Sequence, residues 1–420
     1  MNKPVNTAIA RDALITEFEH VRERSEDLCA PLAADDYQIQ SIVQTSPPKW
    51  HLAHVTWFFE TFVLSRFQPG HKPFHPRFDF LFNSYYQTHG QMQPRDQRCL
   101  LSRPTIEQVY EYRAYINERM LALLVAANDT EWIDLAGFVT LGLNHEQQHQ
   151  ELLLMDIKHN FWSNPLKPAY RDDLKMSAGA YRPMNWIRRE GGVQQIGHAS
   201  PGFAFDNETP RHQRLLRDHL IADRFITNAE YFDFIHDGAY SKPSLWLADG
   251  WELIRREGWQ HPLYWVEEGE NYRQFTLEGM QDINPHEPVC HLSYFEADAY
   301  ANWAGKRLPL EEELEAMLAE QPVTGNFVEN DLLRPAAASG WGQWFGDVWA
   351  WTSSSYSAYP GYRPLPGSLG EYNGKFMSNQ MVLKGGSCAT PLSHIRASYR
   401  NFFYPHERWA FTGLRLAEDL

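Results

Sequence analysis

The sequence predicts an α+β protein with more than one domain, and three observations support this. Its 420 residues exceed what one hydrophobic core usually organises. Residues 1–160 repeat apolar side chains at a period near 3.6, which is typical of amphipathic helices. Beyond residue 178, short apolar runs are broken by Gly, Pro and Asn, which indicates irregular β-rich structure. We therefore predict a helical domain over 1–165, a linker over 166–178 and a second domain over 179–420.

Four helices are expected in the first domain. They cover about 8–28, 51–67, 105–126 and 131–160. The second is apolar nearly all round, which predicts burial, and Thr105 with Gln108 forms a capping-box pattern at the start of the third. The connection over 68–104 is long for a structureless loop, so we expect an up-down bundle with a functional crossover segment.

The second domain contains one clear helical pattern, SYFEADAYANWAGKRLP at 293–309. A second helix is expected in the following PLEEELEAMLAEQ. The remaining runs, such as GGVQQIGH and GDVWAWTSS, suit short strands.

Charge and cysteine content exclude several classes of protein. A net charge of −15 and a pI near 5.6 argue against a nucleic-acid or anionic-membrane partner. The N-terminal residues lack the apolar run of a signal peptide, and no stretch reaches the roughly 20 apolar residues of a membrane span. We expect a cytoplasmic protein, and the oligomeric state is left open. The 4 cysteines form no CxxC pair, so neither a disulfide framework nor a thiolate zinc site is indicated.

The octet NHEQQHQE at 144–151 indicates a metal site. His145 and His149 lie four apart on a predicted helix, so they project in one direction and can share a metal. Glu146 and Glu151 point about 100° and about 200° away from the neighbouring histidine, which makes both poor ligands. The third ligand is expected from the second helix, as His51 or His54.

Two alternatives accompany this site. HEQQH fits the metalloprotease pattern H-E-x-x-H by its letters, but no downstream ligand motif follows and the helical-bundle pattern does not suit such an enzyme. Three neutral imidazoles with open positions suit Fe(II) or Zn(II), and ligand type alone does not decide between them.

The crossover segment contains FNSYYQTHGQMQPRDQR, in which two adjacent tyrosines precede two arginines. Tyr85 and Tyr86 could give a proton or an electron, and Arg95 and Arg98 could hold a carboxylate. The simpler alternative is an aromatic cluster beside a solvent-exposed basic turn.

An ordered set of motifs resembles one family along nearly the whole chain. In the first half these are KWHLAHV and HEQQHQE, which fits H-x-x-x-H-x-E; in the second they are FDNETPRH, ITNAEYFDFI, PVCHLSYFEADAYANWAGKRLP, GDVWAWTSS, LKGGS and YRNFFYPHERWAFTGLRLA. The set resembles the nonheme iron sulfoxide synthases of ergothioneine biosynthesis. The resemblance implies a DinB-like four-helix bundle followed by a formylglycine-generating-enzyme-like, C-type-lectin-like domain.

The resemblance also implies a cofactor, substrates and ligands. His54, His145 and His149 would bind Fe(II), with His54 preferred to His51 because it is the histidine of Leu-Ala-His. The substrates would be hercynine, which is the betaine of histidine, a thiol or selenol donor, and O2. Gln148 would contact the trimethylammonium group of hercynine.

Further site residues follow from the same resemblance. Arg95, with Arg98 beside it, would clamp the carboxylate of the donor, and Tyr85 or Tyr86 would be the catalytic tyrosine. The stretch Asn401, Phe402 and Phe403 would close the pocket and hold the betaine carboxylate.

The donor stays open at this point. Cys99 stands where the family usually carries Gly, and cysteine, γ-glutamylcysteine and a selenosugar are all donors in this group, so a selenoneine synthase is an alternative. Cys388 stands alone in GGSC, without the cysteine pair of a formylglycine-generating enzyme, and is expected to be a buried small residue. A lectin-like binding protein and a zinc thiol-transferase are alternatives from other classes.

Overall fold

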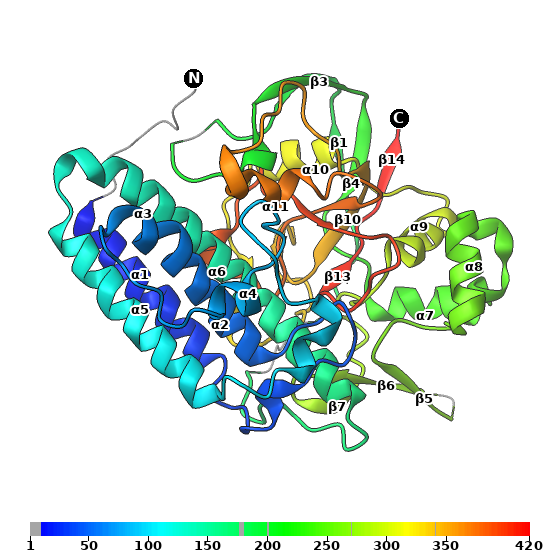
Figure 1. Cartoon of the computed structure of the whole chain (residues 1–420). Helices are drawn as coiled ribbons and strands as arrows, with labels where there is room; N and C mark the ends of the chain where they lie inside the picture. The colour runs from blue at the N-terminus through cyan, green and yellow to red at the C-terminus, as the bar shows by residue number, and fades with distance from the viewer. Residues whose placement is uncertain (1–9, 176–179, 200, 270, 341) are drawn as a thin grey trace. The chain divides into compact units, whose positions relative to one another are not determined.

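The computed structural model describes residues 10–175, 180–199, 201–269, 271–340 and 342–420 (Figure 1). Residues 8 and 9 of the first predicted helix, and residues 176–179 around the end of the predicted linker, lie outside this described part. The chain forms two compact units. The first is Met1–Ser163 with Ser200–Phe205 and Pro364–Tyr372, and the second is Asn164–Ala199, Asp206–Arg363 and Asn373–Leu420. The predicted domain limits stay a prediction.

Long helices dominate the first unit, as the apolar period predicts. They are α1 (Arg11–Asp27), α2 (Pro48–Phe58), which continues through the π-helix η2 (Phe59–Leu64) into α3 (Ser65–Phe67), α5 (Ile106–Ala126) and α6 (Asp129–Ser163). Helices α1 and α2 each pack against both α5 and α6, which confirms the predicted bundle (Figure 1). Every residue of α2 is buried, and Thr105 and Gln108 form the predicted capping box of α5.

The connections of the first unit contain shorter elements. These are η1 (Asp36–Gln38), α4 (Phe78–Phe82) and η3 (Arg95–Leu100). The last two lie within the long crossover segment, so this segment is partly helical rather than structureless.

A buried ionic cluster, formed by Arg22, Arg113 and Glu146, joins α1, α5 and α6. Arg22 Nη1 donates to Glu146 Oε2 at 2.8 Å, and Arg113 Nη2 donates to Glu146 Oε1 at 2.9 Å. Both arginines also donate to Thr56 of α2. All four long helices therefore meet at this ionic cluster, which fixes the position of α6 beside α2.

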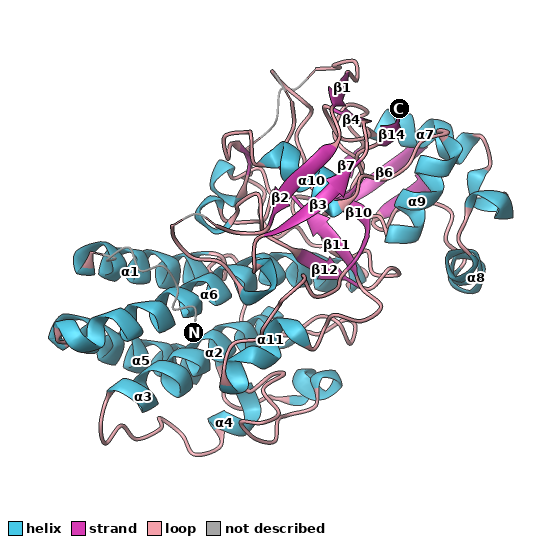
Figure 2. Ribbon diagram, turned by 90° about the horizontal axis from the view of Figure 1, so that it is seen from above, coloured by secondary structure: helices cyan, strands magenta, loops and turns pink. Residues whose placement is uncertain are grey.

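In the part of the second unit that the structure describes, short strands form five small sheets, and Figure 2 shows them interleaved with helices and loops. The strand orders are β1-β4-β14, β12-β11-β10-β13, β2-β3, β5-β6-β7 and β8-β9. The strands are β1 (Trp186–Arg189), β2 (Gly192–Ile196), β3 (His212–Leu216), β4 (His219–Ala222), β5 (Trp265–Glu268), β6 (Asn271–Thr276), β7 (Gly279–Asp282), β8 (Gly325–Asn326), β9 (Phe345–Gly346), β10 (Trp349–Ser355), β11 (Met381–Lys384), β12 (Asn401–Phe403), β13 (Thr412–Gly413) and β14 (Ala417–Asp419).

Helices α9 (Tyr294–Trp303) and α10 (Glu311–Leu318) confirm the two helices predicted in this half, and α10 packs on β2, β3, β10 and β11. Helices α7 (Asn228–His236) and α8 (Ala248–Glu257) were not predicted, and α11 (Glu371–Gly374) is a single turn. The capping box of Thr227 and Glu230 at the start of α7 was a readable signal. Together the helical first unit and the mixed second unit confirm the predicted α+β class.

Within the described ranges, no helix combines the length and the apolar character needed to cross a membrane.

Candidate metal centre

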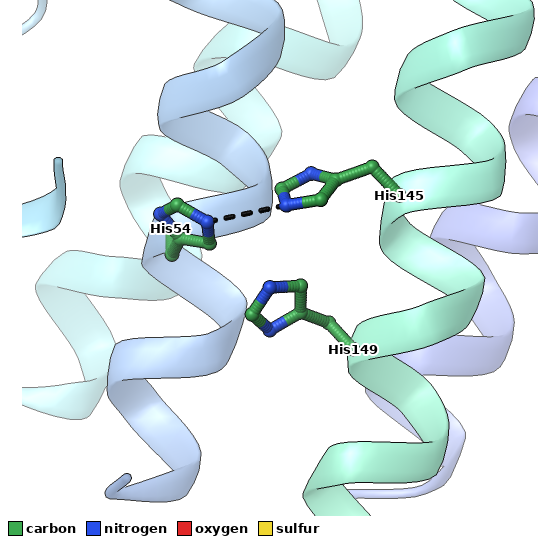
Figure 3. Close-up of side chains that lie close together, drawn as sticks. All are labelled: His54, His145 and His149. Atoms are coloured by element: carbon green, nitrogen blue, oxygen red, sulfur yellow. Dashed lines mark hydrogen bonds between the residues drawn. The ribbon is translucent and has the colours of Figure 1, made fainter. Parts of the chain in front are cut away.

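Three buried histidines from two helices form one cluster. His54 of α2 faces His145 and His149 of α6, and each offers a ring nitrogen within 4.8 Å of the other two (Figure 3). The Nε2 atoms of His54 and His145 are 3.3 Å apart. This cluster, called the histidine cluster below, joins the three residues predicted as metal ligands.

The ring of His54 is fixed on three sides. Its Nδ1 lies 2.6 Å from the carbonyl oxygen of Phe82, so Nδ1 carries the proton and Nε2 keeps its lone pair. Trp50 stacks on the imidazole at 4.6 Å between ring centroids, and Trp57 stacks on it at 5.6 Å. The two indoles therefore restrict rotation of the ring.

Helix α4 of the crossover segment anchors this arrangement. Trp50 Nε1 donates to the carbonyl of Leu81 at 3.1 Å, and Trp57 Nε1 donates to Asp79 Oδ1 at 2.9 Å. Together with Phe82, three residues of this one short helix orient His54 and its stacking partners. The functional role expected for the long connection thus includes support of the histidine cluster.

His149 has a different support. Its Nδ1 lies 2.8 Å from Nδ1 of His51, and His51 Nε2 lies 3.0 Å from Asp156 Oδ2. All three side chains are buried. His51 therefore lies behind His149 and outside the histidine cluster.

His145 has the least support of the three. Its Nδ1 is buried and has no hydrogen-bond partner among the described residues. Its ring packs against Phe58 at 4.9 Å and meets the edge of Tyr372 at 5.4 Å.

Burial keeps the three imidazoles neutral. It lowers the pKa of His145 to about 3, and it lowers the pKa values of His54 and His149 well below the usual range, with the neighbouring His145 adding to the effect. Neutral imidazole is the form that binds a metal ion. Converging neutral nitrogens, with the tautomer of His54 fixed by the Phe82 carbonyl, therefore fit a divalent metal.

Close packing of α6 against the end of α2 and the π-helix η2 brings the ligands together. Gly142 lies one turn before His145, and a Cβ atom there would come within 2.6 Å of the Phe59 ring. A larger residue at 142 would force the helices apart or displace that buried ring.

Glu146 cannot act as the general base that the H-E-x-x-H letters suggest. Burial would raise the pKa of its carboxyl, but Arg22 and Arg113 outweigh this and hold the pKa below its usual range. The carboxylate belongs to the ionic cluster, on another side of α6 from the histidine cluster. The rejection of a metalloprotease is consistent with this geometry.

Gln148 has a partner that the sequence did not predict. The hydroxyl of Tyr372 donates to Gln148 Oε1 at 2.5 Å, while the Tyr372 ring contacts His145. Tyr372 belongs to the first unit although it follows Gln148 by 224 residues in the chain. EYNGKF carries no local signal that points to the histidines, so only the fold reveals this tyrosine.

The two predicted tyrosines have different environments. Tyr85 has a left-handed backbone with φ of 68°, and its hydroxyl accepts a hydrogen bond from Arg95 Nη1 at 2.6 Å. Tyr86 is buried against Trp57 and Phe62, and burial raises the pKa of its hydroxyl. Tyr85 is therefore beside the predicted donor clamp, whereas Tyr86 packs into an aromatic group.

Arg98 is buried rather than exposed on a basic turn. Its guanidinium lies 3.4 Å from the centre of the Trp50 ring and donates to the hydroxyls of Ser46 at 2.9 Å and Ser84 at 3.0 Å. Its positive charge is one of the causes that lower the pKa of His54. Arg98 thus lies near the histidine cluster, and its role toward a donor stays a prediction.

The segment Pro364–Tyr372 also binds residues 87–88, the loop that directly follows Tyr85 and Tyr86. Glu371 accepts hydrogen bonds from the backbone nitrogens of Gln87 at 3.1 Å and Thr88 at 3.0 Å, and from the Thr88 hydroxyl. Adjacent residues Glu371 and Tyr372 therefore contact the loop and helix α6 respectively.

The other predicted site residues lie in the second unit. Asn401, Phe402 and Phe403 form β12, which pairs with β11, and their role stays a prediction. Of the two cysteines noted in the sequence, Cys388 in this unit is fully buried, as expected for a small structural residue, whereas Cys99 in the first unit is partly exposed.

Comparisons with known proteins place the chain in a family. A model of the DinB superfamily matches residues 17–153, and a sulfatase-modifying factor enzyme 1-like domain matches residues 175–420. A hercynine oxygenase of Mycolicibacterium smegmatis is 32% identical, with 98% of this chain and 100% of that protein covered. The chain belongs to the hercynine oxygenase family. A second member of the family, from Mycobacterium tuberculosis, is 31% identical over 89% of this chain and 91% of its own.

The family predicted from the motifs is thereby confirmed, and with it the expectation of an enzyme. Among solved structures, PvdO from Pseudomonas aeruginosa covers 56% of this chain and 94% of its own, with a TM-score of 0.37 and 17% identity.

Proposed function

We propose that this protein is an O2-dependent nonheme iron(II) enzyme that joins sulfur or selenium to the imidazole C2 of hercynine. The observation that supports this most is the histidine cluster in a chain 32% identical to a hercynine oxygenase over 98% of its length. Three imidazoles leave coordination positions open for small substrates.

His54, His145 and His149 are the proposed ligands of the iron. When bound, iron(II) would activate O2 and keep the donor chalcogen deprotonated. The stacked indoles and the carbonyl of Phe82 would hold the His54 ring in position for this. Metal analysis after anaerobic purification separates iron from zinc, and a chain that retains zinc alone would contradict the assignment.

Gln148 is the proposed contact for the trimethylammonium group of hercynine. Its amide oxygen is directed by the Tyr372 hydroxyl, and the aromatic ring of Tyr372 adds a surface suited to a quaternary ammonium. Gln148 follows His145 by three residues on α6, and Tyr372 contacts both side chains, so a hercynine held at Gln148 would present its imidazole toward the histidine cluster.

Arg95 and Arg98 are the proposed contacts for the carboxylate of the donor. Arg95 bonds the Tyr85 hydroxyl, so a donor bound there would lie beside a tyrosine able to supply a proton or an electron. Tyr85, Tyr86 and Tyr372 are the tyrosines to compare. Hydrogen bonding to Arg95 favours Tyr85, and contact with His145 favours Tyr372.

The test measures O2 consumption and products in the iron-loaded enzyme. Hercynine is supplied with cysteine, γ-glutamylcysteine and a selenosugar in competition, and mass spectrometry identifies which chalcogen is attached. We expect O2 uptake that requires both hercynine and one donor. Iron-loaded protein with no affinity for hercynine would overturn the proposal, and would favour a lectin-like role.

The same assay separates the tyrosines. Replacement of the acting tyrosine by phenylalanine is expected to divert O2 consumption toward oxidised donor. Hercynine binding should stay intact in Tyr85→Phe and Tyr86→Phe, and should weaken by no more than about tenfold in Tyr372→Phe, which loses the bond to Gln148. An unchanged product ratio in Tyr85→Phe, Tyr86→Phe and Tyr372→Phe would contradict a tyrosine role.

A further inference from the structure

A hydrogen-bonded chain of three buried side chains ends at His149. Asp156 Oδ2 contacts His51 Nε2 at 3.0 Å, and His51 Nδ1 contacts His149 Nδ1 at 2.8 Å. The exposed fractions of Asp156, His51 and His149 are 2%, 4% and 8%. Because these side chains are buried, an unpaired polar atom would be costly, so each contact must join one donor to one acceptor.

The proton positions follow from the carboxylate. An ionised carboxylate only accepts hydrogen bonds, and Asp156 Oδ2 also accepts from the backbone nitrogen of Ser46 at 2.7 Å. His51 Nε2 therefore carries a proton, and in the neutral imidazole the other ring nitrogen, Nδ1, is an acceptor. His149 must then donate from Nδ1, and its Nε2 keeps a lone pair.

We propose that Asp156 and His51 are positioning residues that hold His149 in the tautomer able to bind metal through Nε2. Helix geometry supports this, because His51 and His54 are three apart on α2 and face the same helix α6, yet only His54 enters the histidine cluster. His54 receives the equivalent support from the Phe82 carbonyl. The inference rests on the metal site of the proposed function, and it extends that site to two residues outside the cluster.

The test measures Co²⁺ affinity of the full chain under conditions free of hercynine, donor and iron. His51→Leu removes both hydrogen bonds, and we expect its affinity to fall about 10- to 100-fold. His51→Gln can accept through its amide oxygen and donate through its amide nitrogen, so its affinity should stay within about threefold of the wild type. His159→Ala is the control, because His159 lies on α6 with Asp156 and His149 but bonds Ser41 at 2.7 Å instead, and the Co²⁺ affinity of this variant should not change.

Two outcomes of the affinity measurement would overturn the proposal. Wild-type affinity in His51→Leu would show that the chain has no effect on the site, and an equal loss in the Leu and Gln variants would identify His51 as a direct ligand. If His51→Leu does not fold, as judged by thermal melting without metal, ¹⁵N NMR of the histidines in the wild type decides. A His149 protonated at Nε2 in the metal-free protein would overturn the proposal. If Co²⁺ binding depends on His51 but the enzyme does not turn over hercynine, only the proposed function is contradicted.

Discussion

Two buried polar clusters lie one residue apart on α6, and they differ in how their polar atoms are satisfied. In the ionic cluster, the carboxylate of Glu146 faces two guanidinium groups and the hydroxyl of Ser25. In the histidine cluster, neutral nitrogens converge without a counter-charge, and His145 Nδ1 has no partner in the described part of the chain. Burial alone does not distinguish a structural cluster from a binding site. Opposite charges in direct contact indicate a structural role for the ionic cluster. Converging nitrogen lone pairs make the histidine cluster suited to a cation.

The strongest test of this contrast removes the matched charge. Glu146→Gln leaves buried Arg22 without a carboxylate and leaves Arg113 with its ion pair to Glu26 alone, so the free energy of unfolding of the metal-free protein should fall by about 3–5 kcal/mol. Urea denaturation measures the change. Glu107→Gln, at an exposed position in the first turn of α5, should destabilise the protein only slightly, because it removes one negative charge from a helix N-terminus. A loss in Glu146→Gln no greater than in this control would contradict a structural role for the ionic cluster.

The ionic cluster also predicts a pH dependence. The folded pKa of Glu146 lies below the ordinary value of 4.5, because Arg22 and Arg113 outweigh burial. Its contribution to stability is therefore present above about pH 4.5 and is lost as the pH falls through the lower folded pKa. Wild-type protein should lose more stability than Glu146→Gln over that acid range. Parallel curves of unfolding free energy against pH would contradict the shift.

Metal addition sharpens the other side of the contrast. Co²⁺ at about 100 times its dissociation constant should stabilise the wild type by about 2.7 kcal/mol, because it binds only the folded state. His149→Ala should lose the metal and most of this gain, and thermal melting with and without Co²⁺ measures both. An equal gain in the variant would mean that the ion binds elsewhere.

The close packing of α6 can be tested without changing any charge. Gly142→Ala should destabilise the protein by about 1–3 kcal/mol and weaken Co²⁺ binding, since the added Cβ meets the Phe59 ring. Gly137→Ala is the matched control on the same helix, where no atom lies within 4 Å of an added Cβ. Better helix propensity should make that control neutral or stabilising by up to about 1 kcal/mol. Equal effects at both glycines would argue against close packing as the cause.

The smallest expected effect concerns the rim of the histidine cluster. Tyr372→Phe removes the hydrogen bond to Gln148, so hercynine affinity should fall by about 0.5–1.5 kcal/mol, or up to about tenfold. Calorimetric titration of hercynine measures this. Tyr110→Phe, which removes a hydroxyl bonded to Tyr37, should bind hercynine as the wild type does. An unchanged affinity in Tyr372→Phe would contradict the idea that Tyr372 orients Gln148 for hercynine binding.

Sequence reasoning reached the parts of this site that follow from local geometry. The spacing of His145 and His149 fixes their common direction on a helix, whereas the choice of His54 over His51 came from the family resemblance of the motif Leu-Ala-His. The hydrogen bonds that orient these rings could not be predicted, because the position of the Phe82 carbonyl depends on the path of the crossover segment. Tyr372 was missed for the same reason, since a contact across 224 residues leaves no periodic signal.

The fold shows the same limit. Long amphipathic helices were predictable because each repeats its pattern over many turns, whereas α7 and α8 are short and lie between polar turns. The pairing of the strands depends on long-range contacts that no local pattern specifies, such as the parallel pair of β10 and β13.

The segment Pro364–Tyr372 has a consequence for engineering. Since it completes the first unit, a fragment that ends at Ser163 would lack both the Tyr372 hydroxyl at Gln148 and the Glu371 carboxylate at Thr88. A chimaera that grafts the bundle of one relative onto the C-terminal part of another must therefore transplant these nine residues with the helices. A chimaera with one junction after the helices would combine the loop at Thr88 from one parent with the segment Pro364–Tyr372 from the other.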